Sequence, residues 1–221
     1  LTTVDSVCDY GNSENVSVDD IDSSDWILEL EDIEKDSGRI ITQKSKHERT
    51  INGVRHRFVN GDVLYSKLRT YLNKVLVAQK DGYCTTEIIP VKSYDCVIPK
   101  YLCAWLRSPF FLSYTAECCY GVKMPRLSTT DARKGIIPLP PINEQKRITQ
   151  KLSKVSELLS SLSNSIDNDY IIQTIKPLLN TLNNSTLYVQ WWYRDMYIST
   201  IDLPTLCWPT TPLKVPVQHL M

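Results

Sequence analysis

The chain has 221 residues, enough for one substantial domain with an appendage or for two small domains, and its 42% hydrophobic and 23% charged residues are ordinary for a globular protein. No apolar run approaches about 20 residues, which excludes a transmembrane helix, and the first residues lack the basic and apolar regions of a signal peptide. We therefore expect a cytoplasmic protein. Because Leu1 stands where an initiator methionine is usual, we expect a fragment, a processed chain or an unusual start.

The formal net charge of zero conceals three blocks of opposite sign. Residues 1–36 hold twelve acidic residues and one basic residue, residues 39–80 hold ten basic and two acidic residues, and residues 120–154 hold eight basic and two acidic residues. Such a chain can present a positive face to a polyanion. The alternative is that the blocks form salt bridges on a solvated surface, and charge alone favours this alternative.

Strands are predicted in the first hundred residues. Residues 26–30 are typical of a short strand that leads into an acidic helix or turn, and residues 63–66 have strand character. Two β-rich runs, at residues 74–78 and 83–89, flank Asp81-Gly82. This arrangement predicts a β-hairpin, because Asp-Gly favours the tight turns that join antiparallel strands.

Two helices are predicted next. Pro99 favours a helix from Tyr101 to about Tyr114, since proline suits a first helical turn and apolar residues follow at helical spacing. Ser128 is expected to cap a short helix that Gly135 ends.

The apolar period changes after residue 141. Residues 136–141 are predicted to be an extended strand, and residues 142–182 to form a long coiled-coil helix. The helix-pairing positions are spaced four, three, four, three and four residues apart: Ile148, Leu152, Val155, Leu159, Leu162 and Ile166. The stripe then resumes out of phase around Pro177, so a break is expected near residues 167–177. Residues 183–221 are a tail to which no element is assigned.

Catalytic and metal-binding motifs are absent from the sequence. It contains no glycine-rich dinucleotide loop, no phosphate-binding loop, no serine-nucleophile elbow and no adenine-methyltransferase signature. The seven cysteines form no Cys-x-x-Cys pair, and the three histidines complete no zinc-ligand spacing. Buried free thiols are favoured over a redox pair at Cys118-Cys119. We therefore expect neither catalytic residues nor a metal site.

Four segments, in the family order and at family-like spacing, resemble the specificity subunits of type I restriction-modification systems. The first runs from Trp26 to Ile40. The others include GDVLYSKLRTYLNK at residues 61–74 with the continuation to Ile88, GVKMPRL at residues 121–127, and IPLPPINEQKRI at residues 137–148. The resemblance covers about residues 1–166.

The resemblance implies an α+β fold with a division of labour. We expect a mixed α/β target-recognition domain at residues 1–141, with a hairpin-containing sheet, followed by the long C-terminal coiled-coil helix. In this family two recognition domains each read one half of a split double-stranded DNA target and do no chemistry. S-adenosylmethionine, ATP and Mg²⁺ belong to the methyltransferase and restriction subunits, so no cofactor is expected in this chain.

A single recognition domain with a single helix leaves an apolar seam that must be buried against a partner. A second copy of the chain would give a two-fold dimer and a palindromic split target. A different half-subunit, or the remainder of a longer two-domain chain, would also bury the seam.

Two basic segments suit contacts with DNA. Phosphates bind Lys, Arg, hydroxyl groups and backbone N–H groups, whereas base edges need polar side chains that reach into a groove. One segment leaves a predicted strand, and the other is a loop in which glycine permits close backbone approach. The candidate DNA-binding residues are Ser66, Lys67, Arg69, Tyr71, Tyr120, Gly121, Lys123 and Arg126.

Less specific interpretations of these residues remain open. Lys67 and Arg69 can be solvated charges at a strand end, and Lys123 and Arg126 can pin their loop to the acidic segment. A third basic group is a weaker candidate for DNA contact: Lys44, Lys46, Arg49, Arg55 and Arg57.

Two other functions are also open. The chain can be the recognition domain of a single-chain restriction-methyltransferase, which predicts methyltransferase motifs in a neighbouring segment. It can instead be a coiled-coil interaction or anti-restriction protein. That alternative predicts partner binding that does not depend on Lys67, Arg69, Lys123 and Arg126.

Overall fold

The computed structural model describes residues 1–121 and 123–165. Its strands form three sheets, and every strand pair is antiparallel except β4 with β9. The five-stranded sheet has the order β3 (Glu14–Ser17), β6 (Val54–Phe58), β9 (Gly82–Cys84), β4 (Trp26–Leu28) and β5 (Lys44–Ser45). The four-stranded sheet has the order β2 (Cys8–Tyr10), β10 (Ile88–Ser93), β7 (Val63–Ser66) and β8 (Val75–Val77). The two-stranded sheet pairs β1 (Thr2–Thr3) with β11 (Ile136–Ile137).

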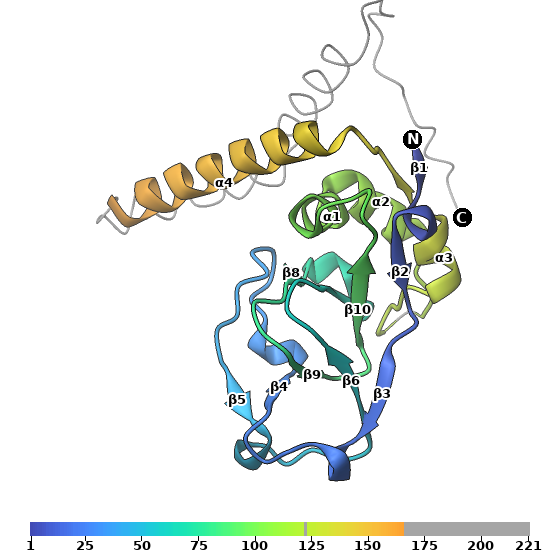
Figure 1. The fold of residues 1–221 in the computed structure, drawn as a ribbon, viewed down its shortest axis with the longest axis vertical. Helices are drawn as coiled ribbons and strands as arrows, with labels where there is room; N and C mark the ends of the chain where they lie inside the picture. Colours follow the sequence, from blue (N-terminus) through green and yellow to red (C-terminus); the bar gives the residue numbers. More distant parts are fainter. Residues whose placement is uncertain (122, 166–221) are drawn as a thin grey trace, which may run out of the picture.

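The four-stranded sheet lies between helices and the five-stranded sheet (Figure 1). Its inner strand β7 is buried on both faces. Val63 and Tyr65 on one face pack into the cluster that includes the helices, and Leu64 on the other face packs into the cluster between the two larger sheets. Alternate side chains of a strand point to opposite faces, so this one strand serves two cores.

The hairpin expected across Asp81-Gly82 is wrong. Strand β8 pairs with β7, whereas β9 pairs with β6 and β4 in the other sheet. Gly82 is needed for close packing and not for a tight turn, because a Cβ there would lie 2.9 Å from Phe58 Cζ and 3.0 Å from the Trp26 carbonyl oxygen. Strands β7 and β8 instead follow one another as an antiparallel pair joined by residues 67–74.

The single helix expected from Tyr101 to about Tyr114 is two helices, α1 (Pro99–Leu106) and α2 (Pro109–Cys118). Pro109 has no N–H group to continue α1, and its ring clashes with the preceding helical turn. Ser108 caps α2 by accepting a hydrogen bond from the Phe111 N–H at 3.3 Å.

Several expected elements are confirmed. The strand near residues 26–30 is β4, with a 3₁₀ turn at Leu30–Asp32 after it, and residues 63–66 form β7. Ser128 caps α3 (Thr129–Lys134) by accepting a hydrogen bond from the Asp131 N–H at 3.0 Å. Gly135 follows α3 and leads into β11.

Helix α4 (Ile142–Ser165) docks by its first turns and then runs away from the globular part of the chain (Figure 1). Gln145 is fully buried. Its Oε1 accepts a hydrogen bond from the Ile98 N–H, and its Nε2 donates to the carbonyl oxygens of Cys96 and Pro140, all at 2.9 Å. The start of α4 is therefore held by a satisfied buried amide as well as by apolar contact.

The expected seam of α4 divides into two parts. Ile148 is buried in the core that contains α1, and Leu152 packs against the same core. Val155 is exposed and Leu159 is half-buried. Four parts of the expected seam and tail lie outside the described residues: the Leu162 side chain, Ile166, the break near residues 167–177 and the tail at 183–221. Pairing through the helix therefore stays a prediction. None of the helices described is both long and apolar enough to span a membrane.

Candidate nucleic-acid interface

The two segments predicted to contact DNA lie side by side. They are the β7–β8 loop (residues 67–74) and the α2–α3 loop (residues 119–128), which are about fifty residues apart in the sequence. Leu68 and Arg126 form an isolated antiparallel bridge. The Arg69 N–H donates to the Pro125 carbonyl oxygen at 2.7 Å, and the Leu127 N–H donates to the Lys67 carbonyl oxygen at 2.9 Å. Backbone hydrogen bonds thus join the two loops into one surface.

The β7–β8 loop has an unusual backbone. Arg69 (φ 51°, ψ 60°) and Asn73 (φ 50°, ψ 43°) both have left-handed conformations, and they flank a 3₁₀ turn at Thr70–Leu72. Left-handed conformations disfavour side chains such as arginine and persist where surrounding contacts impose them. Here the Arg69 N–H bonds the opposite loop, and buried Asn73 donates from Nδ2 to the Arg107 carbonyl oxygen at 3.2 Å.

The α2–α3 loop depends on Gly121. Tyr120 and Arg126 exchange backbone hydrogen bonds of 3.0 and 2.9 Å, which close the loop between them. Gly121 has a φ of 91°, and a Cβ there would lie 3.3 Å from the Met124 carbonyl oxygen. Only glycine adopts this backbone conformation readily, so the residue shapes the loop and brings its backbone to the surface.

Large and charged side chains project from this joined surface. Tyr71 is 57% exposed, Tyr120 is 59% exposed and Met124 is also exposed. Lys123 is exposed, and Lys67 and Arg69 are half-buried. Among the described residues these three cations make no ion pair, in contrast to the solvated salt bridges that their charge also allowed. Aromatic faces next to free cations suit nucleic acid, because bases stack and phosphates attract positive charge.

Ser66 is placed differently from the other candidates. It is 4% exposed, and its hydroxyl donates to the Leu68 carbonyl oxygen at 2.9 Å. The hydroxyl therefore shapes the start of the β7–β8 loop and is not presented to a ligand in this conformation.

A small pocket of about 160 Å³ lies at this surface, and both loops line it. Leu68, Arg69, Leu72 and Lys74 contribute from the β7–β8 loop and Met124 from the α2–α3 loop. Ser66 and two residues of the acidic segment complete the lining, Leu30 and Glu31. The buried Nε of Arg69 makes no hydrogen bond within the part of the chain that is described. Arg69 therefore lines this concave part of the surface, although its Nε atom is enclosed by the protein.

Arg126 pairs with an acidic residue of the protein, Glu87. One interpretation of the sequence expected this partner in the acidic N-terminal segment, but Glu87 lies outside that segment. The Arg126 guanidinium donates to the Glu87 carboxylate, with Nη2 3.0 Å from Oε1 and Nε 3.2 Å from Oε2. The carboxylate raises the pKa of Arg126. Glu87 is a residue of this site that the sequence analysis missed. The second family-like segment contains Glu87, but nothing local indicates its role, because its partner lies 39 residues further along the chain.

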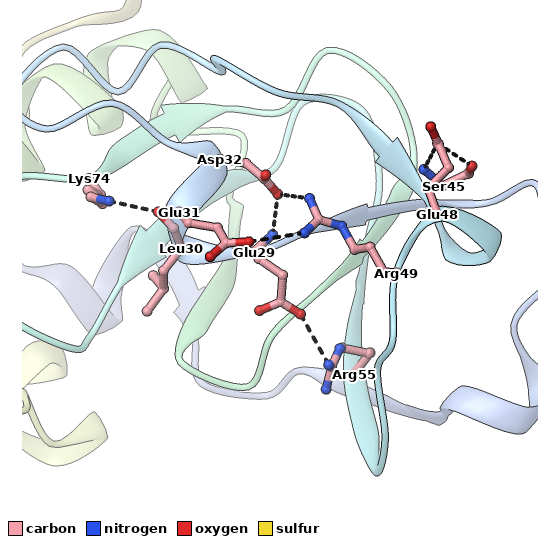
Figure 2. A network of polar contacts seen from close by, with 9 residues as sticks. All are labelled: Glu29, Leu30, Glu31, Asp32, Ser45, Glu48, Arg49, Arg55 and Lys74. Atoms are coloured by element: carbon pink, nitrogen blue, oxygen red, sulfur yellow. Dashed lines mark hydrogen bonds and ion pairs between the residues drawn. The ribbon is translucent and has the colours of Figure 1, made fainter.

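Arginines of the third basic group form ion pairs with residues of the acidic N-terminal segment (Figure 2). Arg49 has a side chain only 7% exposed and bonds buried Asp32, with Glu31 at 3.5 Å. Arg55 pairs with Glu29 at 3.1 Å. We call Glu29, Glu31, Asp32, Arg49 and Arg55 the η3 network, after the 3₁₀ turn that carries its acids. Burial raises the pKa of Glu29 against the opposing effect of both arginines.

The remaining members of the third group also have specific positions. Lys46 donates to the Ile21 carbonyl oxygen at 2.5 Å, and Arg57 lies 3.5 Å from Glu14. Lys44 is exposed at the edge of the five-stranded sheet and lines a hollow of about 520 Å³ beside the η3 network. Three acids and three bases line that hollow, so its charges balance and it offers no polyanion site: Glu29, Glu31, Glu48, Lys44, Arg49 and Arg55.

Lys74 connects the η3 network to the β7–β8 loop (Figure 2). Its Nζ donates to the Leu30 carbonyl oxygen at 2.7 Å. Burial lowers the pKa of Lys74, opposed by the nearby Asp32 and Glu31 carboxylates. Lys74 thus ties the β7–β8 loop to the turn that carries the acids of the η3 network.

Three of the described thiols are buried as expected, namely Cys8, Cys84 and Cys103, whereas Cys96 is exposed and the expectation of a buried thiol is wrong there. Burial raises the pKa of Cys8 to about 12 and that of Cys103 to about 11. Cys118 and Cys119 are both free. Within the described residues, no group of three or more His, Cys, Asp and Glu side chains could hold a metal ion.

Comparison with curated proteins finds two specificity subunits from Escherichia coli. The chain is 24% identical over 136 residues to the type I restriction enzyme EcoDI specificity subunit, which covers 62% of this chain and 30% of that protein. It is 25% identical over 75 residues to the EcoBI specificity subunit, which covers 34% of this chain and 16% of that protein. The chain thus spans about a third or less of these relatives.

Solved structures share the fold. The HsdS subunit from Thermoanaerobacter tengcongensis matches with a TM-score of 0.64 and 20% identity over 80% of this chain and 46% of that chain. A chain from a study of complex assembly and conformational transition of the type I R-M system matches with a TM-score of 0.63 and 21% identity, over 81% of this chain and 48% of that chain. At these identities the likeness shows the fold alone.

A family model gives the assignment. The model described as "Type I restriction modification DNA specificity domain" matches residues 30–169, which is more than half of the chain. This range contains the β7–β8 loop, the α2–α3 loop, Glu87 and the described part of α4. The chain therefore belongs to the type I restriction-modification DNA specificity family.

Proposed function

We propose that the chain reads one half of a bipartite double-stranded DNA target through the joined surface of the β7–β8 and α2–α3 loops. One observation carries the proposal: two loops distant in sequence are bonded into a single surface whose cations Lys67, Arg69 and Lys123 are left without ion pairs among the described residues. Of the third basic group, Arg49 and Arg55 are held in the η3 network, and Arg57 pairs with Glu14. Cations without protein partners are available to neutralise phosphates.

The two kinds of side chain on this surface suit two kinds of contact. Lys67 and Lys123 fit phosphate oxygens, which position a protein on the duplex without reading sequence. Arg69 has the planar fork that pairs with the O6 and N7 acceptors of guanine, and Tyr71 and Tyr120 offer apolar and hydroxyl contacts to base edges. Gly121 lets the backbone come close to the DNA.

We propose that α4 joins this reader to the rest of a type I complex. Ile148 and Leu152 are covered by the chain's own core, so pairing with another helix would begin at Val155 and include Leu159. The partner helix belongs to a second copy, to another half-subunit or to the remainder of a longer chain. Methyltransferase subunits would dock on the assembled reader and supply S-adenosylmethionine chemistry, while this chain performs no chemical step.

Selection from random duplex DNA tests the proposal. The purified chain is mixed with its methyltransferase subunit and a pool of random double-stranded DNA, and the retained DNA is sequenced. We expect a split motif, with binding that weakens steeply as salt rises. A palindromic motif would show that the chain pairs with itself. If the methyltransferase subunit binds but no motif is enriched at any salt concentration, the chain is not a DNA reader and the interaction-protein alternative replaces it.

A further inference from the structure

Glu87 contacts both loops of the candidate interface. It lies in the short connection between β9 and β10, directly before Ile88, which pairs with Ser66 at the end of β7. Its carbonyl oxygen accepts a hydrogen bond from the Lys67 N–H at 3.0 Å, at the start of the β7–β8 loop. Its carboxylate accepts hydrogen bonds from Arg126 at 3.0, 3.2 and 3.3 Å, at the end of the α2–α3 loop. One residue therefore contacts both loops, in addition to the backbone hydrogen bonds that join the loops directly.

The pair between Glu87 and Arg126 is bidentate. Two nitrogen atoms of the guanidinium contact both carboxylate oxygens, which fixes the plane and direction of the arginine as well as its distance. The side chains are 24% and 37% exposed, so solvent screens the pair and it contributes more to geometry than to stability.

The outer part of the α2–α3 loop depends on the position of Arg126. Tyr120 is held to Arg126 by two backbone hydrogen bonds, and Arg126 is held to Leu68 by the isolated bridge. Tyr120, Lys123 and Met124 project from the loop that this residue closes. These backbone bonds do not involve the Arg126 side chain, whose guanidinium adds a further link from the loop to Glu87. If that link is released, the loop is held by its backbone bonds alone, and the side chains that face outward are less firmly oriented.

We propose that Glu87 is a positioning residue for sequence reading, with two effects on DNA binding. It holds the α2–α3 loop in the geometry that presents Tyr120 and Lys123, and it keeps the Arg126 guanidinium away from phosphates. The inference rests on the proposed function. Loss of Glu87 should disturb the geometry of the loop and so reduce discrimination between target and scrambled DNA. It should at the same time free the Arg126 cation and so strengthen binding to DNA of any sequence.

The substitution Glu87→Gln separates positioning from other roles. A lost DNA contact would weaken binding to every duplex, and a purely structural defect would lower the folded fraction without changing relative affinities. We expect instead that binding to a scrambled duplex becomes several-fold tighter and its salt dependence steeper, by about 0.9 in the slope of log K against log salt concentration, because one more phosphate is neutralised. The ratio of target to scrambled affinity should fall at least tenfold.

Three further variants make the test specific. Glu87→Gln combined with Arg126→Gln should lose the added affinity for scrambled DNA and keep the poor discrimination. Glu87→Asp keeps the charge but shortens the arm, so it should lower discrimination without tightening binding to scrambled DNA. Glu14→Gln is the matched control, because it removes one negative charge from an exposed pair with Arg57 in the five-stranded sheet. It should leave discrimination unchanged.

The affinities are measured on the chain with its methyltransferase subunit, with the selected target and a scrambled duplex at several salt concentrations. If the wild-type chain discriminates its target and Glu87→Gln leaves both the ratio and the salt slope unchanged, this inference is overturned and the proposed function stands. Reduced discrimination with weaker binding to scrambled DNA would also overturn it. If the wild-type chain enriches no motif, the proposed function fails and this inference fails with it.

Discussion

The η3 network and the joined loop surface both contain residues of the basic blocks, but the cations of the network are paired with acids, whereas Lys67, Arg69 and Lys123 on the loop surface have no ion pair among the described residues. Arg49 has a side chain only 7% exposed and is bonded to a buried carboxylate. Lys123 is exposed, and no ion pair involves it in the described part of the chain. A count of charges along the sequence does not separate these two residues. What separates them is whether folding brings an acid to the cation, because a buried ion must be paired and an exposed one need not be.

The largest effect expected from this comparison is on the stability of the η3 network. Arg49→Met leaves Asp32 buried without its charged partner, so the free energy of unfolding should fall by about 3–5 kcal/mol. Urea unfolding measures this change. The matched control is Arg57→Met, which removes an exposed pair with Glu14 and should change stability by about 0–1 kcal/mol. Equal effects of the two substitutions would remove the distinction between buried and exposed cations.

The buried amide at the start of α4 should give the next largest effect. Gln145→Leu leaves the Ile98 N–H and the carbonyl oxygens of Cys96 and Pro140 without this partner, at an expected loss of about 2–3 kcal/mol. Thermal and urea unfolding report the loss, and Gln150→Leu, at an exposed position of the same helix, is the control. A stable Gln145→Leu variant would mean that apolar contact alone holds α4.

A smaller effect is expected from pH. Burial lowers the pKa of His56, and its Nδ1 lies 2.9 Å from the Ile88 carbonyl oxygen. The unfolded state binds the proton more tightly than the folded state. The free energy of unfolding should therefore decrease as the pH falls below 6.5, the ordinary pKa of histidine. Urea unfolding between pH 7.5 and 5 should show this slope, and His56→Asn should flatten it. The exposed His47→Asn serves as control, and a slope that survives in His56→Asn assigns the effect to other groups.

Features set by local chemistry could be predicted from the sequence. The cap at Ser128, the strands at residues 26–28 and 63–66, and the start of a helix at Pro99 each depend on neighbouring residues, and all are present. Pro109 is also a local signal, because proline has no N–H group for a helix interior, and the prediction of one long helix gave it too little weight.

Features set by distant partners could not be predicted in this way. Asp81-Gly82 has the composition of a hairpin turn, but Gly82 is required by Phe58 and Trp26 from two other strands. Glu87 stands in a family-like segment, but its role follows from its contacts with Arg126 and Lys67 on the two loops. The candidate DNA-binding segments were found because resemblance to a family added information that residue patterns alone did not carry.

The salt dependence of DNA binding tests the central claim most directly. The dissociation constant of the chain with its methyltransferase subunit is measured on the selected duplex across a salt series, for wild type and for Lys67→Gln with Lys123→Gln. The control, Lys44→Gln with Lys80→Gln, removes equal charge near the five-stranded sheet, where Lys44 lies in β5 and the Lys80 Nζ lies 4.8 Å from the centroid of the Trp26 ring of β4. The loop variant should bind more weakly, with a slope of log K against log salt concentration shallower by up to about 1.8, while the control keeps the wild-type slope. An unchanged slope in the loop variant, with a shallower slope in the control, would contradict the assignment of the joined loops as the surface that contacts DNA.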